Sequence, residues 1–227
     1  ILGSDGRGYG LAESFGHTVS DVVPALVQLV GKGNYFKQVS GVRVNATVKL
    51  FVNEECAASD TGELQLTNYG ISGIPVFQVS RYAAKALNAK KTVFAEVDFI
   101  PTMEETELKD FISKRKIQHG ERLATEFFVG MLHDKLSSML LKEAYIPAHI
   151  SANEIREDKW DKLLEFIKHF KIEITDTNSF EQAQVCAGGV YTCEINCDTM
   201  ESVYEKNLYL TGELLDVDGI CGGYNLQ

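Results

Sequence analysis

The chain lacks the sequence features that several large classes of protein require. No apolar run approaches the roughly 18 residues that a membrane-spanning helix needs. The first residues, ILGSDG, also lack the basic and apolar regions of a signal peptide. We therefore expect a soluble cytoplasmic protein without a membrane partner. We find no internal repeat and no low-complexity tract.

Positive charge is scarce. The 227 residues include 22 basic and 32 acidic side chains, which gives a net charge of −10. Such a surface repels phosphate backbones, so we expect small-molecule partners and not nucleic acid. Hydrophobic residues make up 44% of the chain, which is enough to fill the core of one large domain or two small ones.

Metal and thiol motifs are weak. Five cysteines are an odd number in a chain too large to need disulfide staples, so reduced thiols are expected. Cys193 and Cys197 have a spacing that zinc can use, but no second Cys or His pair follows, which favours small buried hydrophobes. The histidines are scattered without metal-binding spacing, and only His17, directly after a glycine-rich loop, remains a candidate.

The glycine-rich loops do not carry a nucleotide-phosphate motif. Both loops that begin like G-x-G-x-x-G have another residue at the third glycine, Leu11 in one and Phe36 in the other, and no P-loop lysine motif is present. A serine-hydrolase elbow is excluded around Ser72 because the glycine two residues earlier is absent. The chain by itself therefore has no recognisable phosphate cradle.

Hydrophobic periodicity predicts a β-rich unit in the first hundred residues. Alternation over Val42–Val52 and again over Glu63–Leu66 predicts a hairpin with a polar loop at 53–62. Pro75–Ala86 has helical spacing, with proline near the first turn, and Val93–Ile100 alternates as another strand.

Helix-forming residues dominate from position 101 to 168. Thr102 with Glu105 and Ser151 with Glu154 have capping-box spacing, and three or four helices are expected to form a small bundle inserted into the β-rich unit. A short helix is also expected over about Tyr9–Phe15. Further strands are predicted at 171–175, 182–187, 191–195 and 207–210.

The last sixteen residues hold the most informative pattern. Gly212-Glu213, Asp216 and then Gly222-Gly223 before a predicted helix suit a polyhydroxylated ligand. Carboxylates accept hydrogen bonds from ribose or ribityl hydroxyls, and paired glycines let the backbone approach a flat ring. An acidic surface loop ended by a glycine turn fits the same spacing equally well.

Several segments resemble a known family, the bacterial FAD-dependent oxidoreductases that include aminoacetone oxidase and a bile-acid reductase. The resemblance runs along nearly the whole chain in the order of that family. The segments are GSDGRGYGLAESFGH, GELQLTNYGISGIPVFQVSR, AQVCAGGVYTCEI, TMES and LYLTGELLDVDGICGGYNLQ.

The resemblance implies an α+β fold in which a β-barrel-like domain carries an inserted small helical bundle and is flanked by remnants of a Rossmann-type FAD domain. On this interpretation, residues 1–20 and 206–227 are the flavin-domain remnants, 21–100 and 169–205 the barrel-like domain, and 101–168 the bundle. Family members begin with a G-x-G-x-x-G segment and end with a helix after GGYNLQ, and this chain has neither. We therefore expect a fragment that is inactive alone.

The resemblance also implies site residues. Asp216 would meet the ribityl chain, and the backbone after Gly223 would face the pyrimidine end of the flavin. The implied cofactor-binding residues are Ser4, Asp5, Gly6, Tyr9, Gly212, Glu213, Asp216, Gly222, Gly223, Tyr224, Asn225, Leu226 and Gln227.

The function that follows from the resemblance is that of an FAD-dependent, NAD(P)H-linked oxidoreductase acting on a small carbonyl, amine or enone. The flavin would carry the hydride while the protein positions it. No catalytic residue is assigned. Cys221 as a redox thiol and Tyr69 or His17 as proton donors are open alternatives to structural roles. The rival class is a non-catalytic protein- or ligand-binding module.

Overall fold

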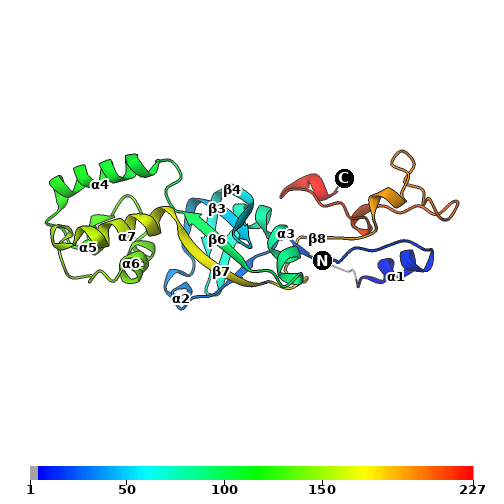
Figure 1. The fold of residues 1–227 in the computed structure, drawn as a ribbon, viewed down its shortest axis with the longest axis horizontal. Helices are drawn as coiled ribbons and strands as arrows, with labels where there is room; N and C mark the ends of the chain where they lie inside the picture. The colour runs from blue at the N-terminus through cyan, green and yellow to red at the C-terminus, as the bar shows by residue number, and fades with distance from the viewer. Residues whose placement is uncertain (1–4, 227) are drawn as a thin grey trace.

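A computed structural model describes residues 5–226. Ser4 and Gln227, two of the implied cofactor-binding residues, lie outside this range. Figure 1 shows an elongated molecule in which helices α4–α7 occupy one end, a β-barrel the middle, and the segments near both termini the other end. Within the described residues, no helix combines the length and apolar character needed to cross a membrane.

Six antiparallel strands form a closed barrel. Their order around the barrel is β2-β5-β4-β3-β6-β7. Their bounds are β2 (Leu29–Gly31), β3 (Arg43–Val52), β4 (Glu55–Leu66), β5 (Gly70–Gly73), β6 (Val93–Asp98) and β7 (Phe170–Thr177). Alternate side chains of β3 and β6 are buried in the barrel core, including Val48, Leu50, Ala95 and Val97, as the period-two pattern predicts.

The hairpin forms as predicted, but its loop is much shorter than expected. β3 and β4 pair from Arg43↔Gln65 to Val52↔Glu55, so most of the expected loop at 53–62 is strand. The turn consists of Asn53 and Glu54, both with positive φ, as a type I′ hairpin turn requires. The first half of β4 is polar because it lies largely exposed, so its composition resembles that of a loop.

Helix α3 (Ile74–Asn88) confirms the prediction over 75–86, with proline at its start. It packs Val76, Val79 and Ala83 into the barrel core and lies at the end of the barrel nearer to the terminal segments (Figure 1). A four-residue helix, α2 (Phe36–Val39), connects β2 to β3.

The predicted bundle consists of α4 (Glu105–His119), α5 (Ala124–Phe127), α6 (Asp134–Glu143) and α7 (Glu157–Lys168). Its core is aromatic: Phe127 and Phe128 both lie against Trp160, with ring centroids 5.3 and 6.1 Å apart. The chain therefore buries its single tryptophan at the centre of the bundle.

The two predicted capping boxes differ in outcome. Ser151 and Glu154 form one, but it begins the short 3₁₀ turn η1 (Ala152–Glu154) and not α7 itself. The box expected from Thr102 and Glu105 was wrong: Glu104 caps α4, with Glu107 as its partner. A glutamate side chain can also accept the N3 amide, so the sequence offers two competing starts in one acidic stretch.

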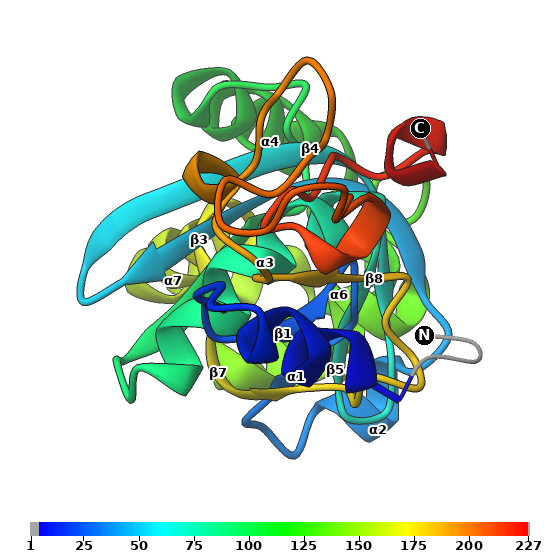
Figure 2. The same ribbon diagram turned by 90° about the vertical axis from the view of Figure 1, so that its right-hand side faces the viewer.

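The segments outside the barrel contain little regular structure. They hold α1 (Arg7–Ser14), the strand pair β1 (Val23–Ala25) and β8 (Val185–Ala187), and the 3₁₀ turns η2 (Thr192–Glu194), η3 (Gly212–Leu214) and η4 (Gly223–Leu226). Among residues 5–226, β1 and β8 pair only with each other. Figure 2 views this end of the molecule.

Three of the predicted late strands differ from the structure. The strand expected at 191–195 is the η2 turn, and the one expected at 207–210 is reduced to an isolated bridge between Glu201 and Tyr209. Within 182–187 only β8 is strand. These segments alternate in hydrophobicity but find no long partner strand, so the pattern alone does not produce a sheet.

Candidate functional site

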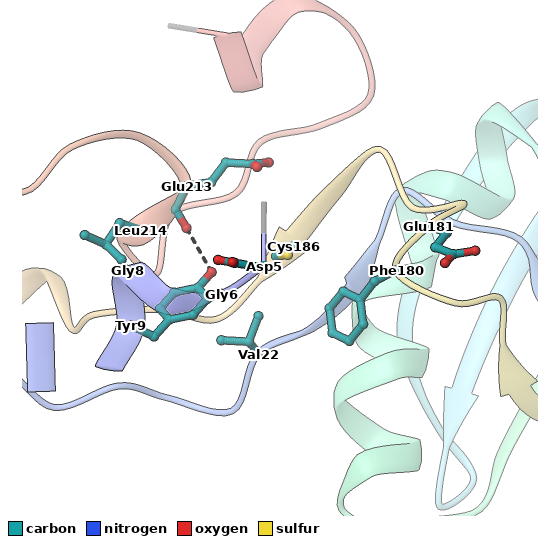
Figure 3. A pocket seen from close by; sticks show the side chains of 10 residues that line it. All are labelled: Asp5, Gly6, Gly8, Tyr9, Val22, Phe180, Glu181, Cys186, Glu213 and Leu214. Atoms are coloured by element: carbon teal, nitrogen blue, oxygen red, sulfur yellow. Dashed lines mark hydrogen bonds between the residues drawn. The ribbon is translucent and has the colours of Figure 1, made fainter. Parts of the chain in front are cut away.

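A cavity of about 620 Å³ lies between the terminal segments and the barrel. Figure 3 shows Phe180 and Glu181 on the side nearer to the barrel, and Tyr9, Glu213 and Leu214 on the opposite side. Its lining combines α1, the approach to β1, the loop after β7, β8 and η3. The lining residues are Asp5, Gly6, Gly8, Tyr9, Val22, Phe180, Glu181, Cys186, Glu213 and Leu214.

The start of α1 places Tyr9 in the cavity. Gly6 has φ 77, a left-handed conformation that favours glycine, and it accepts a hydrogen bond from the Tyr9 amide at 3.1 Å. The Tyr9 hydroxyl donates to the carbonyl oxygen of Glu213 at 3.2 Å (Figure 3). Burial, with Cys186 and Glu213 nearby, raises the pKa of Tyr9 to about 12, so the phenol keeps its proton at neutral pH.

The wall of the cavity is mostly apolar. Val22, Leu214 and the ring of Phe180 provide hydrocarbon surface, and the buried Cys186 lies among them. Burial and the nearby Glu213 raise the pKa of the Cys186 thiol, which therefore stays neutral. The cavity thus combines an apolar surface with the carboxylates of Asp5, Glu181 and Glu213.

Two consecutive glycines after β8 allow η3 to lie against the strand pair. Gly189 has φ 148, and an added Cβ would lie 2.6 Å from the Leu214 carbonyl oxygen. Gly188, with φ 103, approaches the Asp21 carbonyl in the same way. Only glycine accepts both the conformation and the approach. Reasoning from the sequence missed this pair, although a Gly-Gly step directly after a predicted strand is a signal for close backbone contact.

Asp216, predicted to meet a ribityl chain, instead makes hydrogen bonds within its own chain. Its carboxylate accepts from the Ser20 hydroxyl at 3.1 Å and from the Gly188 amide at 3.1 Å. It does not line the cavity. The Lys85 ammonium lies 3.8 Å away, so Asp216 connects the terminal segments to α3.

Residues 222–225 of the GGYNLQ segment also lie outside the cavity lining. Gly223–Leu226 form the η4 turn, where the sequence predicts the start of a helix. Asn225 is occupied within its own loop, since its Oδ1 accepts from the Gly219 amide at 2.7 Å. The Tyr224 side chain is 62% exposed, and Gly222 has φ 134.

This tail is attached to α3. Arg81 and Asp218 form an ion pair at 3.0 Å, and the Cys221 amide donates to the side chain of Gln78 at 2.9 Å. Burial raises the pKa of Asp218 despite the opposing effect of Arg81. Cys221 lies outside the cavity lining, so the structure does not bring this candidate redox thiol to Tyr9 or Glu213.

Of the implied cofactor-binding residues, Asp5, Gly6, Tyr9 and Glu213 therefore meet at one cavity. Sequence reasoning missed Val22, Phe180 and Cys186. Val22 and Phe180 belong to no motif, and Cys186 lies in one of the resembling segments but received no role there. Gly212 lies beside the cavity as the first residue of η3.

The two candidate proton donors lie elsewhere. His17 is buried, with Nδ1 3.2 Å from Glu194 Oε2 and Nε2 2.8 Å from Ser202 Oγ. The Tyr69 hydroxyl accepts a hydrogen bond from Asn178 at 2.8 Å. Neither side chain lines the cavity, and these partners indicate structural roles.

The zinc interpretation of Cys193 and Cys197 gains no support. Both thiols are exposed, contrary to the expectation of small buried hydrophobes. Between residues 5 and 226 no three His, Cys, Asp or Glu side chains are grouped so that they would hold a metal ion.

Comparison with known proteins identifies relatives along the whole chain. The chain is 49% identical to a 3-dehydro-bile acid delta(4,6)-reductase of Clostridium scindens, covering 100% of the chain and 55% of the relative. It is 30% and 26% identical to the ribosomal RNA dihydrouridine synthases of Haemophilus influenzae and Escherichia coli, again over 100% of the chain, and covers 53% and 54% of those proteins. The chain thus spans about half the length of the curated relatives that it matches.

The barrel and helices match a family model described as the HI0933-like protein barrel and H2TH domain over residues 23–185. This range begins at β1 and ends at the first residue of β8, so it contains the closed barrel and the bundle found in the structure. The chain therefore belongs to the HI0933-like protein family.

Proposed function

We propose that this chain is part of an FAD-dependent oxidoreductase and that the cavity lined by Tyr9 and Glu213 is its contribution to the flavin site. The reductase relative, 49% identical over the whole chain, is the observation that carries the reaction class. The dihydrouridine synthases are named for a product that has gained hydrogen, which is consistent with the same class.

The lining suits a flavin. A volume of about 620 Å³ lies within the range of roughly 300–1,000 Å³ that is usual for cofactor and ligand sites. The carboxylates of Asp5 and Glu213 would accept hydrogen bonds from sugar or ribityl hydroxyls. Val22 and Leu214 would contact the apolar surface of a ring. Asp216, by contrast, acts in this proposal by holding Ser20 and Gly188 in place.

The chain's own residues would bind the flavin and exclude water from the cavity. Tyr9 stays protonated because its pKa is about 12. Its hydroxyl donates a hydrogen bond to the Glu213 carbonyl oxygen, and this bond fixes η3 against α1. Phe180 and Leu214 would shield a bound ring from solvent. The flavin would supply hydride transfer, with NAD(P)H as the reductant.

In this proposal the segments 1–20 and 206–227 belong to the flavin domain, 21–100 and 169–205 to the barrel-like domain, and 101–168 to the bundle. The pairing of β1 with β8 brings the two connections to the barrel side by side, which supports the boundary near residue 20. It does not support the boundary at 205, because Val190 and Ile195 pack with Ala12 in one hydrophobic cluster. The protein would act in the cytoplasm, and this chain alone would be inactive.

We propose a conjugated enone as the substrate class, among the small carbonyls, amines and enones considered above. The bile-acid reductase is the relative with 49% identity, against 30% and 26% for the two RNA-modifying enzymes. A net charge of −10 also favours a small molecule over ribosomal RNA, whose phosphates an acidic surface repels.

The test is flavin retention by the full-length protein. After desalting, the wild type should keep the absorption spectrum of bound flavin, and Glu213→Gln and Asp5→Asn should each weaken FAD binding by about tenfold, as expected for a lost charged hydrogen bond of about 1.4 kcal/mol. Glu205→Gln removes the same charge from an exposed loop outside the cavity lining and should change nothing. A full-length protein without flavin, or cavity variants that bind like the control, would refute the proposal.

A further inference from the structure

A second cavity, of about 520 Å³, lies in the helical half of the molecule, remote from the cavity with Tyr9. α2, α5, α6 and the segment after α6 contribute to it. Its lining residues are Gln38, Thr125, Ser138, Leu141, Lys142, Tyr145, Ile146, Pro147 and Ala148. The volume is large enough for a small organic molecule.

The chemistry of this lining is amphipathic. Leu141, Ile146 and Pro147 provide an apolar wall, while Ser138 and Gln38 are neutral hydrogen-bonding groups. Lys142 is the charged residue of the lining, which contains no carboxylate among the residues that define it. The interior therefore suits a hydrocarbon body, and the edge suits a negatively charged head.

Two more ammonium groups lie near Tyr145, which is one of the lining residues. The Nζ atoms of Lys159 and Lys162, both on α7, lie 5.2 and 5.7 Å from the centre of the Tyr145 ring. Within residues 5–226, neither they nor Lys142 forms an ion pair with a carboxylate. Lys142 is therefore available to an anion at the cavity, and Lys159 and Lys162 add positive charge next to Tyr145.

The end of α6 shapes one wall of this cavity. Tyr145 follows the helix at the position where a left-handed residue is common, and it adopts φ 56. The Ile146 amide donates to the Leu141 carbonyl oxygen at 2.9 Å, which closes the helix end. The turn brings Ile146 and Pro147 to the cavity, while the Tyr145 side chain is 76% exposed.

We propose that this second cavity binds a small amphipathic carboxylate, with its hydrocarbon body against Leu141 and Ile146 and its carboxylate beside Lys142. Thr125, Ser138 and Gln38 would serve hydroxyl or carbonyl groups along the body of the ligand. This site is independent of the flavin proposal, since it shares no residue with the first cavity.

The test is calorimetric titration of the full-length protein with decanoate below its micelle concentration. Saturable binding with one site per chain is expected. Lys142→Gln should weaken it by about three- to tenfold, as loss of one attractive charge at a solvent-exposed edge predicts. Ser138→Phe, which would fill the cavity from α6, should abolish it. Lys109→Gln removes the same charge on α4, away from the cavity, and should leave the affinity unchanged.

The neutral ligand 1-decanol separates the charge from the apolar contact, because its affinity should not respond to Lys142→Gln. Thermal unfolding of each variant confirms that it is folded, and Lys142 is exposed, so its substitution leaves the core intact. Absence of saturable decanoate binding, equal loss in the Lys109 and Lys142 variants, or unchanged binding by Ser138→Phe would each overturn the proposal. Flavin retention is measured separately and is expected to be normal in all these variants.

Discussion

The Nε2 atom of His17 lies 2.8 Å from the hydroxyl oxygen of Ser202, although 185 positions separate the two residues in the chain. On its other side, the Nδ1 of His17 donates to the Glu194 carboxylate at 3.2 Å, and the Thr18 amide donates to the same oxygen. Ser202 Oγ accepts from the Tyr204 and Glu205 amides, so its proton is directed to the imidazole. This buried chain of hydrogen bonds fixes the segment after α1 to the region of η2.

We expect His17→Asn to lower the free energy of unfolding by about 2–3 kcal/mol, because it leaves Glu194 and Ser202 buried with unpaired groups. Ser202→Ala should also destabilise the protein. Since both variants remove the same hydrogen bond, the double variant should lose about 1 kcal/mol less than the sum of the two. Urea unfolding of the four proteins measures this coupling, and strictly additive losses would contradict it.

Lys168 forms the corresponding anchor between the barrel and the bundle. Its buried ammonium group donates to Asp98 at 2.6 Å and to the carbonyl oxygens of Ile100 and Met103 at 3.0 and 2.6 Å. We expect Lys168→Met to lower the free energy of unfolding by about 3 kcal/mol, because the Asp98 carboxylate and two carbonyls lose their partner. The measurement is the denaturant midpoint with an unchanged m-value.

The matched control for Lys168 is Lys32→Met. Lys32 pairs with Glu173 at 2.9 Å, but both side chains are more than half exposed. Exposed pairs contribute little, so the control should change stability by less than about 1 kcal/mol. If the two substitutions had equal effects, burial of the Lys168 site would not be the cause.

His169 predicts a pH dependence of stability. Its hydrogen bond to Glu96 at 3.0 Å raises the pKa of the imidazole above 6.5. Partial burial opposes this shift, and the hydrogen bond to Glu105 at 2.7 Å adds to it. When folding raises the pKa of a group, that group stabilises the fold fully at pH values below its pKa in the unfolded state. The stabilisation is lost as the pH rises through its pKa in the folded state.

We therefore expect the wild type to lose stability relative to His169→Asn as the pH rises above about 6.5 and through the folded-state pKa of His169. Unfolding free energies of both proteins across this range provide the measurement. His149→Asn, at an exposed position, should follow the wild type. A constant difference between wild type and His169→Asn at all pH values would show that the imidazole contributes only its shape.

The close approach of η3 to the chain after β8 requires a glycine at position 189. Gly189→Ala would place a Cβ 2.6 Å from the Leu214 carbonyl, at a φ of 148 that alanine rarely adopts. We expect a loss of more than about 1 kcal/mol in unfolding free energy and a displaced wall of the first cavity. Gly10→Ala, in α1 with no atom within 4 Å of the added Cβ, should instead stabilise the protein by about 0.5–1 kcal/mol. Thermal unfolding with opposite shifts of the midpoint would confirm both.

Strands with one buried face were predictable from the sequence, because burial imposes an alternating pattern on the strand itself. The alternation of Val48 and Leu50 identified β3 because the middle of one face of that strand is buried. The polar first half of β4 was mistaken for a loop, since a strand exposed on both faces has no apolar period to detect. The alternation at 207–210 was misleading for the opposite reason, because no neighbouring chain completes a sheet there.

The candidate site was predictable only in part. Asp5, Tyr9 and Glu213 were proposed together from a family resemblance, and they do meet in space. The chemical reasoning about Asp216 from its spacing alone could not include Ser20 and Gly188, whose contacts arise from residues distant in sequence. The place of Cys186 in the cavity was also unpredictable, because it depends on the pairing of β8 with β1, which is distant in sequence.

The pairing of β1 with β8 has a consequence for how such a protein changes over generations. Val23 lies opposite Ala187 and Ala25 opposite Val185, so the chain leaves and returns through two adjacent antiparallel strands. The segment between these strands, which contains the barrel and the bundle, therefore begins and ends at nearly the same place. A short turn joining Ala25 to Val185 would close the gap between the two strands, so recombination could remove or exchange the barrel and bundle as one unit. The cost would be the contacts of α3 with Asp216 and Asp218.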